Sequence, residues 1–227
     1  MGTDTPAVLI EPFLSPPFEQ WAYIVRRPGT EEVLVVDPGF LTGPLLEHLR
    51  SCGLRPAAIL NTHGHSDHIA GNRAIKEAFP ESPIVIGRNE ASLLVDPEAN
   101  LSARFGQSIT SPPADLLVDH GDRLNLAGIS FEVREIPGHS PGSVVFAATA
   151  EGLPFVIGGD VLFAGGIGRF DFPGGDGRLL ITGVRSKLFD LPDETRVYPG
   201  HGPETTIGFE RRNNPFVRDG TTPFLLD

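Results

Sequence analysis

The chain has 227 residues, of which 40% are hydrophobic and 21% charged, and its formal net charge is −11. This size and composition predict one α/β domain over residues 1–227, and the acidity disfavours nucleic acid, whose binding depends on Lys and Arg. No apolar run approaches the length needed to span a bilayer, so we expect no membrane partner.

The N-terminal part alternates short β-type runs with turns and then leads into a histidine-rich segment. The expected elements are a strand pair at 21–26 and 33–36, a helix at 43–51, a strand at 57–60 and a helix at 69–79. The leucines at 45, 46 and 49 have helical spacing, which supports the first helix. We expect Asp67 to cap the second helix.

The second part of the chain continues the alternation of strands and helices. The expected elements are strands at 84–86, 129–136, 143–148, 154–158 and 195–198, and helices at 89–95, 178–189 and 204–213. Periodicity fades over residues 96–114, which predicts either a lid over the active site or a plain surface excursion. Interleaved strands and helices without a linker favour helices packed outside sheet layers.

Residues 63–68 read His-Gly-His-Ser-Asp-His. Histidines seldom cluster in an apolar core, because each ring needs partners for both nitrogens. Side chains two positions apart leave a tight loop on a common side, so His63 and His65 can face one metal position while Asp67 and His68 face another. Imidazole with carboxylate suits zinc or iron rather than calcium or magnesium.

Three further side chains follow predicted strands on glycine-containing turns. His139 lies in Pro-Gly-His-Ser-Pro-Gly, Asp160 in Gly-Gly-Asp, and His201 in Tyr-Pro-Gly-His-Gly. Such turns fix the direction of the side chain that they carry. These three residues complete a set of seven candidate ligands.

The seven ligands can be divided between two ions. The first ion would be held by His63, His65 and His139, the second by Asp67, His68 and His201, and Asp160 would be shared between them. Two cations that share one hydroxide provide a nucleophile at neutral pH. Asp37 is expected to orient a ligand histidine, since ligating imidazoles usually donate their second N–H. Two divalent ions are expected, with zinc favoured and iron or manganese also compatible.

In this order, His-x-His-x-Asp-His, Gly-His, Gly-Asp and Gly-His resemble the metallo-β-lactamase fold superfamily, from Asp37 to about Asn214. The resemblance implies an αββα sandwich in which two facing mixed sheets are flanked by helices and the metals lie at one edge. The resemblance implies the same division of the seven ligands between two ions as their types and spacing in the sequence.

Within that superfamily, residues 159–163, 168–171 and 199–206 are similar to the small, single-domain glyoxalase II-like hydrolases. This similarity implies hydrolysis of S-2-hydroxyacylglutathione-type thioesters by a metal-bound hydroxide, with Asp67 orienting the nucleophile. The 26 residues after His201 do not provide the helical domain that helps to hold glutathione in full-length glyoxalase II.

Arg169 and Asp171 stand where glyoxalase II has a lysine and a tyrosine that contact glutathione. Both are therefore candidate substrate contacts. Arg169 can either recognise a substrate carboxylate or form an ion pair with Asp171. The replacement of both glutathione contacts leaves the thiol carrier open.

The main alternative on the same fold is a mononuclear iron persulfide dioxygenase that uses His63, His139 and Asp160 as a facial triad. The complete second ligand set around His201 favours the dinuclear hydrolase. Lactamase activity is less expected, because lactamases lack the shared aspartate at position 160. A metal-binding scaffold or sensor without turnover is the non-enzymatic alternative.

Cys52 is the one cysteine of the chain, so no internal disulfide can form. We expect its thiol to be buried and inert at the end of the first helix. Without a segment that resembles a signal peptide, a cytoplasmic location is the default. The expected partner is a small-molecule thioester, and the expected assembly is a monomer or small homo-oligomer.

Overall fold

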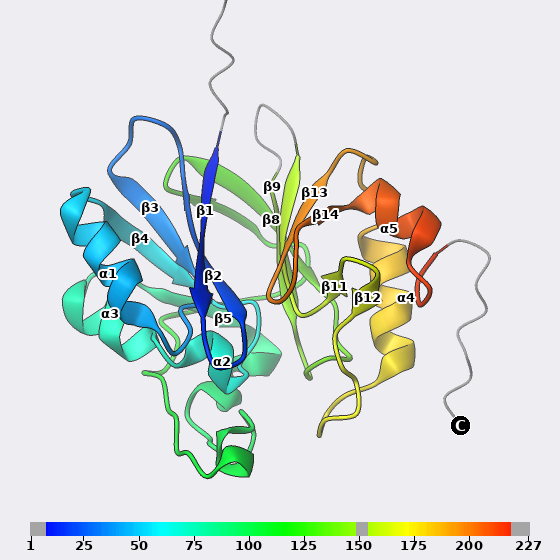
Figure 1. Ribbon diagram of the computed structural model, residues 1–227, viewed down its shortest axis with the longest axis horizontal. Coiled ribbons are helices and arrows are strands. Elements are labelled where there is room, and N and C mark those ends of the chain that lie inside the picture. Colours follow the sequence, from blue (N-terminus) through cyan, green and yellow to red (C-terminus); the bar gives the residue numbers. More distant parts are fainter. Residues whose placement is uncertain (1–7, 149–153, 219–227) are drawn as a thin grey trace, which may run out of the picture.

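The computed structural model describes residues 8–148 and 154–218. Two six-stranded sheets face each other, and helices cover the outer side of each sheet (Figure 1). Both sheets are mixed, because each contains parallel as well as antiparallel neighbours. The predicted αββα sandwich is therefore confirmed.

The first sheet is built from the first six strands in chain order. They are β1 (Leu9–Ser15), β2 (Gln20–Arg26), β3 (Glu32–Val36), β4 (Arg55–Leu60), β5 (Ile84–Gly87) and β6 (Leu116–Val118). The strands β1 to β3 form an antiparallel meander, which includes the predicted pair, and β3 to β6 run parallel. The parallel strands all end at the same edge of the sheet, and β4 runs directly into the histidine-rich segment.

The second sheet has the order β14-β13-β10-β9-β8-β7. Its strands are β7 (Arg123–Leu126), β8 (Ile129–Glu135), β9 (Val144–Ala148), β10 (Phe155–Gly159), β13 (Arg196–Pro199) and β14 (Thr205–Thr206). A small separate hairpin consists of β11 (Leu162–Phe163) and β12 (Gly166–Ile167). The turns that carry His139, Asp160 and His201 follow β8, β10 and β13.

The helices divide between the outer faces. The α-helices are α1 (Thr42–Ser51), α2 (Ser66–Ile69), α3 (Asn72–Ala78), α4 (Gly177–Lys187) and α5 (Ile207–Asn213), and the 3-10 helices are η1 (Arg88–Leu94) and η2 (Ser102–Phe105). In Figure 1, α1 and α3 lie outside the first sheet, whereas α4 and α5 lie outside the second. None of the helices in the described part of the chain is long and apolar enough to cross a membrane.

The strands carry apolar side chains on both faces because each sheet is covered on both sides. In β2, Tyr23 and Val25 point into the core between the sheets, whereas Ala22 and Ile24 join the core beneath α1 and α3. Phe131 and Phe146 are buried from the second sheet and pack edge to face at a centroid distance of 6.4 Å. A third core joins the outer face of the second sheet to α4 and α5.

The helix predicted over 69–79 is present but begins later, because α3 covers Asn72–Ala78 and a separate short helix, α2, precedes it. The Gly71 N–H donates to the carbonyl of Pro38 at 2.8 Å instead of to the residue four positions earlier, and this tertiary bond breaks the helix. Asp67 lies inside α2, whose N-cap is His65, so its expected capping role is wrong. The side chain of Asp67 is thereby free for the site.

Cys52 is exposed, which contradicts the expected buried thiol. It follows α1 on the solvent side, with Sγ 3.9 Å from His48 Nδ1. Two smaller differences concern helices: residues 88–94 form a 3-10 helix, and the helix expected at 204–213 begins only at Ile207, after the short strand β14.

Candidate metal centre

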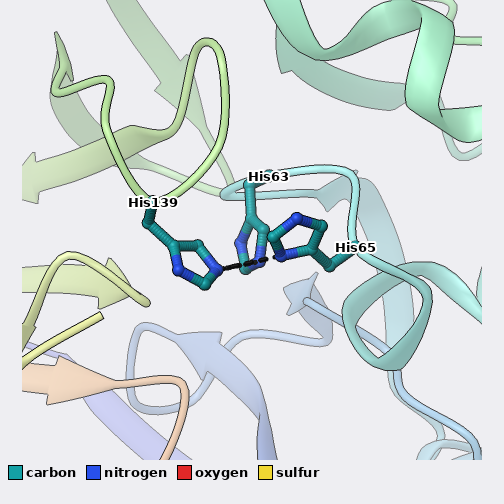
Figure 2. Close-up of side chains that lie close together, drawn as sticks. All are labelled: His63, His65 and His139. Carbon is teal, nitrogen blue, oxygen red and sulfur yellow. Dashed lines mark hydrogen bonds between the residues drawn. The ribbon is translucent and has the colours of Figure 1, made fainter. Parts of the chain in front are cut away.

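The loop from Asn61 to His65 and the helix α2 carry four of the candidate ligands at the edge where β4 ends. Figure 2 shows that His63 and His65 extend from this loop toward His139, which comes from the turn after β8. His139 Nε2 lies 3.3 Å from His63 Nε2 and 2.9 Å from His65 Nδ1. Three ring nitrogens from two distant segments thus converge on one point, which is the geometry of a three-histidine metal position.

A second group of donors lies beside the first. Asp67 Oδ2 is 3.3 Å from His201 Nε2 and 3.8 Å from His68 Nε2. The donor atoms of Asp67, His68 and His201 all lie within 4.8 Å of one another, as do those of the three-histidine group.

Asp160 lies between the two groups. Its Oδ2 is 3.5 Å from both His139 Nε2 and His201 Nε2, and its Oδ1 is 3.4 Å from His68 Nε2. One carboxylate therefore faces nitrogens from both groups. The structure brings all seven predicted residues together, in the two groups and with the shared aspartate that the sequence analysis assigned.

Backbone and carboxylate acceptors fix which nitrogen of three rings faces the centre. Nδ1–H donates to the Arg169 carbonyl in His139 (2.7 Å), to the Phe18 carbonyl in His201 (3.0 Å) and to Asp37 Oδ2 in His68 (3.0 Å). Since these acceptors carry no proton, Nδ1 must carry it in the neutral ring. Each Nε2 is left bare toward the centre, as a metal requires.

Asp37 acts on two of the histidines. It accepts the Nδ1–H of His68 directly, and it accepts the backbone N–H and the hydroxyl of Thr62 at 2.8 and 2.6 Å. Because the Thr62 hydroxyl is committed to Asp37, its oxygen is available to accept from His63 Nδ1 at 3.1 Å. The expected contact between Asp37 and a ligand histidine is present, and it extends to His63 through Thr62.

The three histidines of the first group are held in the neutral form. Burial lowers the pKa of His63 well below its ordinary value and lowers that of His65 to about 3. Burial also lowers the pKa of His139. A neutral imidazole is the form that binds metal, so these rings need not lose a proton at neutral pH.

The second group behaves differently, because carboxylates surround its histidines. Burial alone would lower the pKa of His68, but Asp160, Asp67 and Asp37 raise it well above its ordinary value. Burial would raise the pKa of Asp160, yet the positive charge of the neighbouring His68 lowers it. Three carboxylates on a single imidazole mark this position as one that attracts positive charge.

The donors fit a divalent metal. Among the described residues, His68 Nε2 and Asp160 Oδ1 are buried without a hydrogen-bond partner, although both point into the centre. An unpaired buried polar atom is costly, and a cation between them would remove that penalty. Five imidazoles with two carboxylates suit zinc or iron better than a hard, oxygen-seeking ion.

The metal-free protein is expected to lose stability as the pH rises from 7 to 9. The raised pKa values of His68 and His201 mean that the folded state binds protons more tightly than the unfolded chain. That contribution is complete below the unfolded pKa of about 6.5 and disappears as the pH rises through the folded values. The neutral histidines of the first group oppose it only at and below that unfolded value, outside this window. Thermal unfolding of chelator-treated protein, with metal-loaded protein as the control, measures this; stability that rises across the window contradicts it.

A cavity of about 440 Å³ opens beside the two groups. Besides metal-centre residues, it is lined by Phe18, Ser66, Asn100, Leu101, Phe105, Phe163, Arg169 and Phe172. The segment 96–114, predicted to be a lid or a surface excursion, supplies part of this wall. Its buried Asn100 accepts the Ser66 N–H at 3.0 Å through the backbone carbonyl, which ties the wall to the ligand segment.

The two candidate substrate contacts have different positions. Arg169 lines the cavity and lies over the ring of Phe172, 4.3 Å from its centroid. Asp171 forms a two-pronged ion pair with Arg169, at 3.0 and 2.8 Å, and both side chains are exposed. Of the two roles considered for Arg169, the structure therefore contains the ion pair. A fully exposed ion pair is screened by water and contributes little net free energy, so a substrate carboxylate can compete for Arg169.

Sequence reasoning missed Phe18, Thr62 and Glu90. Phe18 acts on His201 through a backbone carbonyl, for which no residue type gives a signal. Thr62 directly precedes His63, and this position next to the histidine motif was the signal that could have identified it. Glu90 is fully buried in η1 and reaches the ligand turns only through the tertiary fold.

Comparison with known proteins agrees with this architecture. The family model described as the metallo-beta-lactamase superfamily matches residues 15–201. The probable metallo-hydrolase YqgX of Bacillus subtilis is 40% identical over 188 residues, which cover 82% of this chain and 88% of that protein. Hydroxyacylglutathione hydrolase GloC of Haemophilus influenzae is 37% identical over 186 residues, covering 81% and 86%.

Three solved structures have the same fold over most of the chain. BLEG-1, titled a B3 metallo-beta-lactamase, matches with a TM-score of 0.87 and 38% identity, covering 92% of this chain and 99% of that one. TTHA1623 in a di-iron-bound form gives 0.78 and 38%, covering 91% and 99%. ETHE1 from Myxococcus xanthus gives 0.76 and 28%, covering 92% and 84%. With a family model over residues 15–201 and relatives of this identity and coverage, the chain belongs to the metallo-beta-lactamase superfamily.

Proposed function

We propose that this protein is a metal-dependent hydrolase of small thioesters of the S-2-hydroxyacylglutathione type. The observation that carries the proposal is the pair of ligand groups that share Asp160 and open into one cavity. The similarity to a relative named hydroxyacylglutathione hydrolase supports this substrate class. A small-molecule thioester is then the partner, and the proposal includes one domain over residues 1–227, a cytoplasmic location and a monomer or small homo-oligomer.

Two divalent ions are proposed, one held by His63, His65 and His139, the other by Asp67, His68 and His201. Zinc suits these donors, manganese remains compatible, and the similarity to a structure in a di-iron-bound form supports iron as well. When bound, such ions supply Lewis acidity and lower the pKa of a water that they hold.

The protein's own residues then position the reactants. Asp67 lines the cavity with its carboxylate and orients the attacking water. Asp37, the Arg169 carbonyl and the Phe18 carbonyl hold three histidine rings in place. The leaving group is a thiolate, which departs without protonation at neutral pH, so the reaction needs no dedicated general acid.

The cavity walls favour a substrate with an apolar portion. Among the lining residues that are not ligands, the apolar ones are Phe18, Leu101, Phe105, Phe163 and Phe172. Phe105 packs edge to face on Phe18 at a centroid distance of 5.3 Å, which closes the wall between the β1–β2 turn and η2. Arg169 at the same cavity is the side chain best placed for a substrate carboxylate once Asp171 releases it.

Metal-loaded protein is expected to hydrolyse S-D-lactoylglutathione, followed as the loss of thioester absorbance, and a chelator should abolish the activity. A β-lactam serves as the comparison substrate, because a similar structure carries the lactamase title. Turnover of the thioester at a kcat/KM at least about tenfold above the β-lactam supports the proposal. Turnover of the β-lactam alone, or thioester hydrolysis that survives complete metal removal, contradicts it.

The second candidate is a mononuclear iron persulfide dioxygenase. It is favoured by the close approach of His63, His139 and Asp160, at 3.3 Å between the two histidines and 3.5 Å from His139 to the carboxylate. Two histidines with one carboxylate form the facial triad of such enzymes. Oxygen uptake on glutathione persulfide by iron-loaded protein, without thioester hydrolysis, would replace the first candidate with this one.

A further inference from the structure

We propose that Glu90 is a positioning residue for the three-histidine group. Its buried carboxylate joins the two turns that carry the histidines of that group. The histidine turn is residues 61–65, and the His139 turn is residues 137–142. This inference depends on a metal being bound there and is independent of the substrate.

The contacts of Glu90 reach both turns. Oε2 accepts the backbone N–H of Gly64, the residue between His63 and His65, at 2.8 Å. Oε1 accepts the Ser140 hydroxyl at 2.7 Å and the Gly142 backbone N–H at 2.6 Å. Each carboxylate oxygen therefore accepts hydrogen bonds from one turn only, and the carboxylate sets the distance between the two turns.

The surroundings of Glu90 leave little freedom for this arrangement to relax. Its side chain is fully buried, and no Lys or Arg forms an ion pair with it in the part of the chain that the structure describes. Both turns also press against the helix η1: Gly64 packs on Leu93, and a Cβ at Gly142 would lie 3.2 Å from Asn89 Cα. A charge-assisted hydrogen bond is stronger than a neutral one, so the carboxylate holds the turns where the amide of a glutamine would not.

The Glu90→Gln substitution separates this role from mere burial. The glutamine oxygen can retain Ser140 and Gly142, but its NH₂ then faces the Gly64 N–H, a donor against a donor. The histidine turn must shift relative to the His139 turn. The matched control is Glu210→Gln, because Glu210 is another fully buried carboxylate with three donors, Gly165 N–H at 2.9 Å, the Thr205 hydroxyl at 2.6 Å and Asn214 Nδ2 at 2.8 Å, none of them in either turn.

The measurement is metal affinity, by competition of Zn²⁺ with a chromophoric chelator, together with the d–d absorption of the cobalt-substituted protein. In Glu90→Gln we expect the affinity for one ion to fall about 10–100-fold, with a changed cobalt spectrum, while Glu210→Gln keeps the wild-type values. Wild-type affinity and spectrum in a folded Glu90→Gln protein, or an equal loss in both variants, overturns the proposal.

Ser140→Ala provides a second test if the glutamine variant does not fold. It removes one of the three donors and leaves the carboxylate with the two backbone N–H groups. We expect a measurable loss of metal affinity that does not exceed about tenfold, again with a shifted cobalt spectrum. A Ser140→Ala protein that matches wild type in both measurements also overturns the proposal. Because no substrate is involved, failure here is distinct from failure of thioester hydrolysis.

Discussion

Replacing Asp67 with alanine is expected to lower kcat for thioester hydrolysis by about 10²–10⁴-fold while the fold is retained. The carboxylate lies at the cavity, 3.3 Å from His201 Nε2, so in the proposed mechanism its loss would remove both a ligand of the second group and the acceptor that orients the attacking water. The side chain faces histidines rather than the hydrophobic core. We therefore expect the fold to tolerate its loss.

Steady-state kinetics with and without added metal measure this effect, and circular dichroism checks the fold. Asp119→Ala is the matched control, since Asp119 pairs with Arg88 at the exposed surface, 2.8 Å away, and takes no part in the cavity. The control should keep the wild-type kcat. An Asp67→Ala protein with more than about a tenth of the wild-type kcat would remove Asp67 from the mechanism.

Replacing Gly200 with alanine is expected to reduce metal affinity by at least about 10–100-fold and turnover with it. A Cβ at this position would overlap Asp160 Oδ1 and lie 2.6 Å from His68 Cε1. Neither Asp160 nor His68 can move aside without leaving its place in the centre. The same Cβ would also lie 3.3 Å from the backbone carbonyl carbon of Gly159. The methyl group therefore occupies space that the second ion and the shared carboxylate need.

Gly166→Ala is the matched control for this glycine. Its Cβ would meet nothing closer than Phe163 Cβ at 3.8 Å, an ordinary contact. Zinc competition and metal content of both purified variants provide the comparison. A Gly200→Ala protein that binds metal as tightly as the control would show that Asp160 and His68 do not need their present positions.

The sequence was sufficient to assemble the candidate site because its signals are local. Each of His139, Asp160 and His201 follows a strand on a glycine turn, and the structure brings all three to the histidine-rich segment. The pattern of strands and helices predicted helices outside sheet layers, and the resemblance to the superfamily implied the αββα sandwich. Asp37 was also recognisable, because it ends a neighbouring strand at the same edge and reaches His68.

The remaining features depend on tertiary contacts that no local pattern carries. The break between α2 and α3 comes from the bond of Gly71 to Pro38, and Phe18 contributes a carbonyl from a turn 183 residues before His201. In the sequence, nothing distinguishes Glu90 from an ordinary helical glutamate, and only the tertiary fold places it between two turns. The exposure of Cys52 likewise depends on which side of α1 faces the sheet.

Each ligand group takes donors from both sheets, and this determines when a metal can bind during folding. His65 and His139 are 74 residues apart, so the unfolded chain does not offer the three-histidine group as a unit. We therefore expect the apolar core around Phe131 and Phe146 to form before a metal can bind both segments. Binding to the native state alone would then add about 4 kcal/mol per ion at a free metal concentration a thousandfold above Kd, so metal binding would reinforce a fold that is already formed.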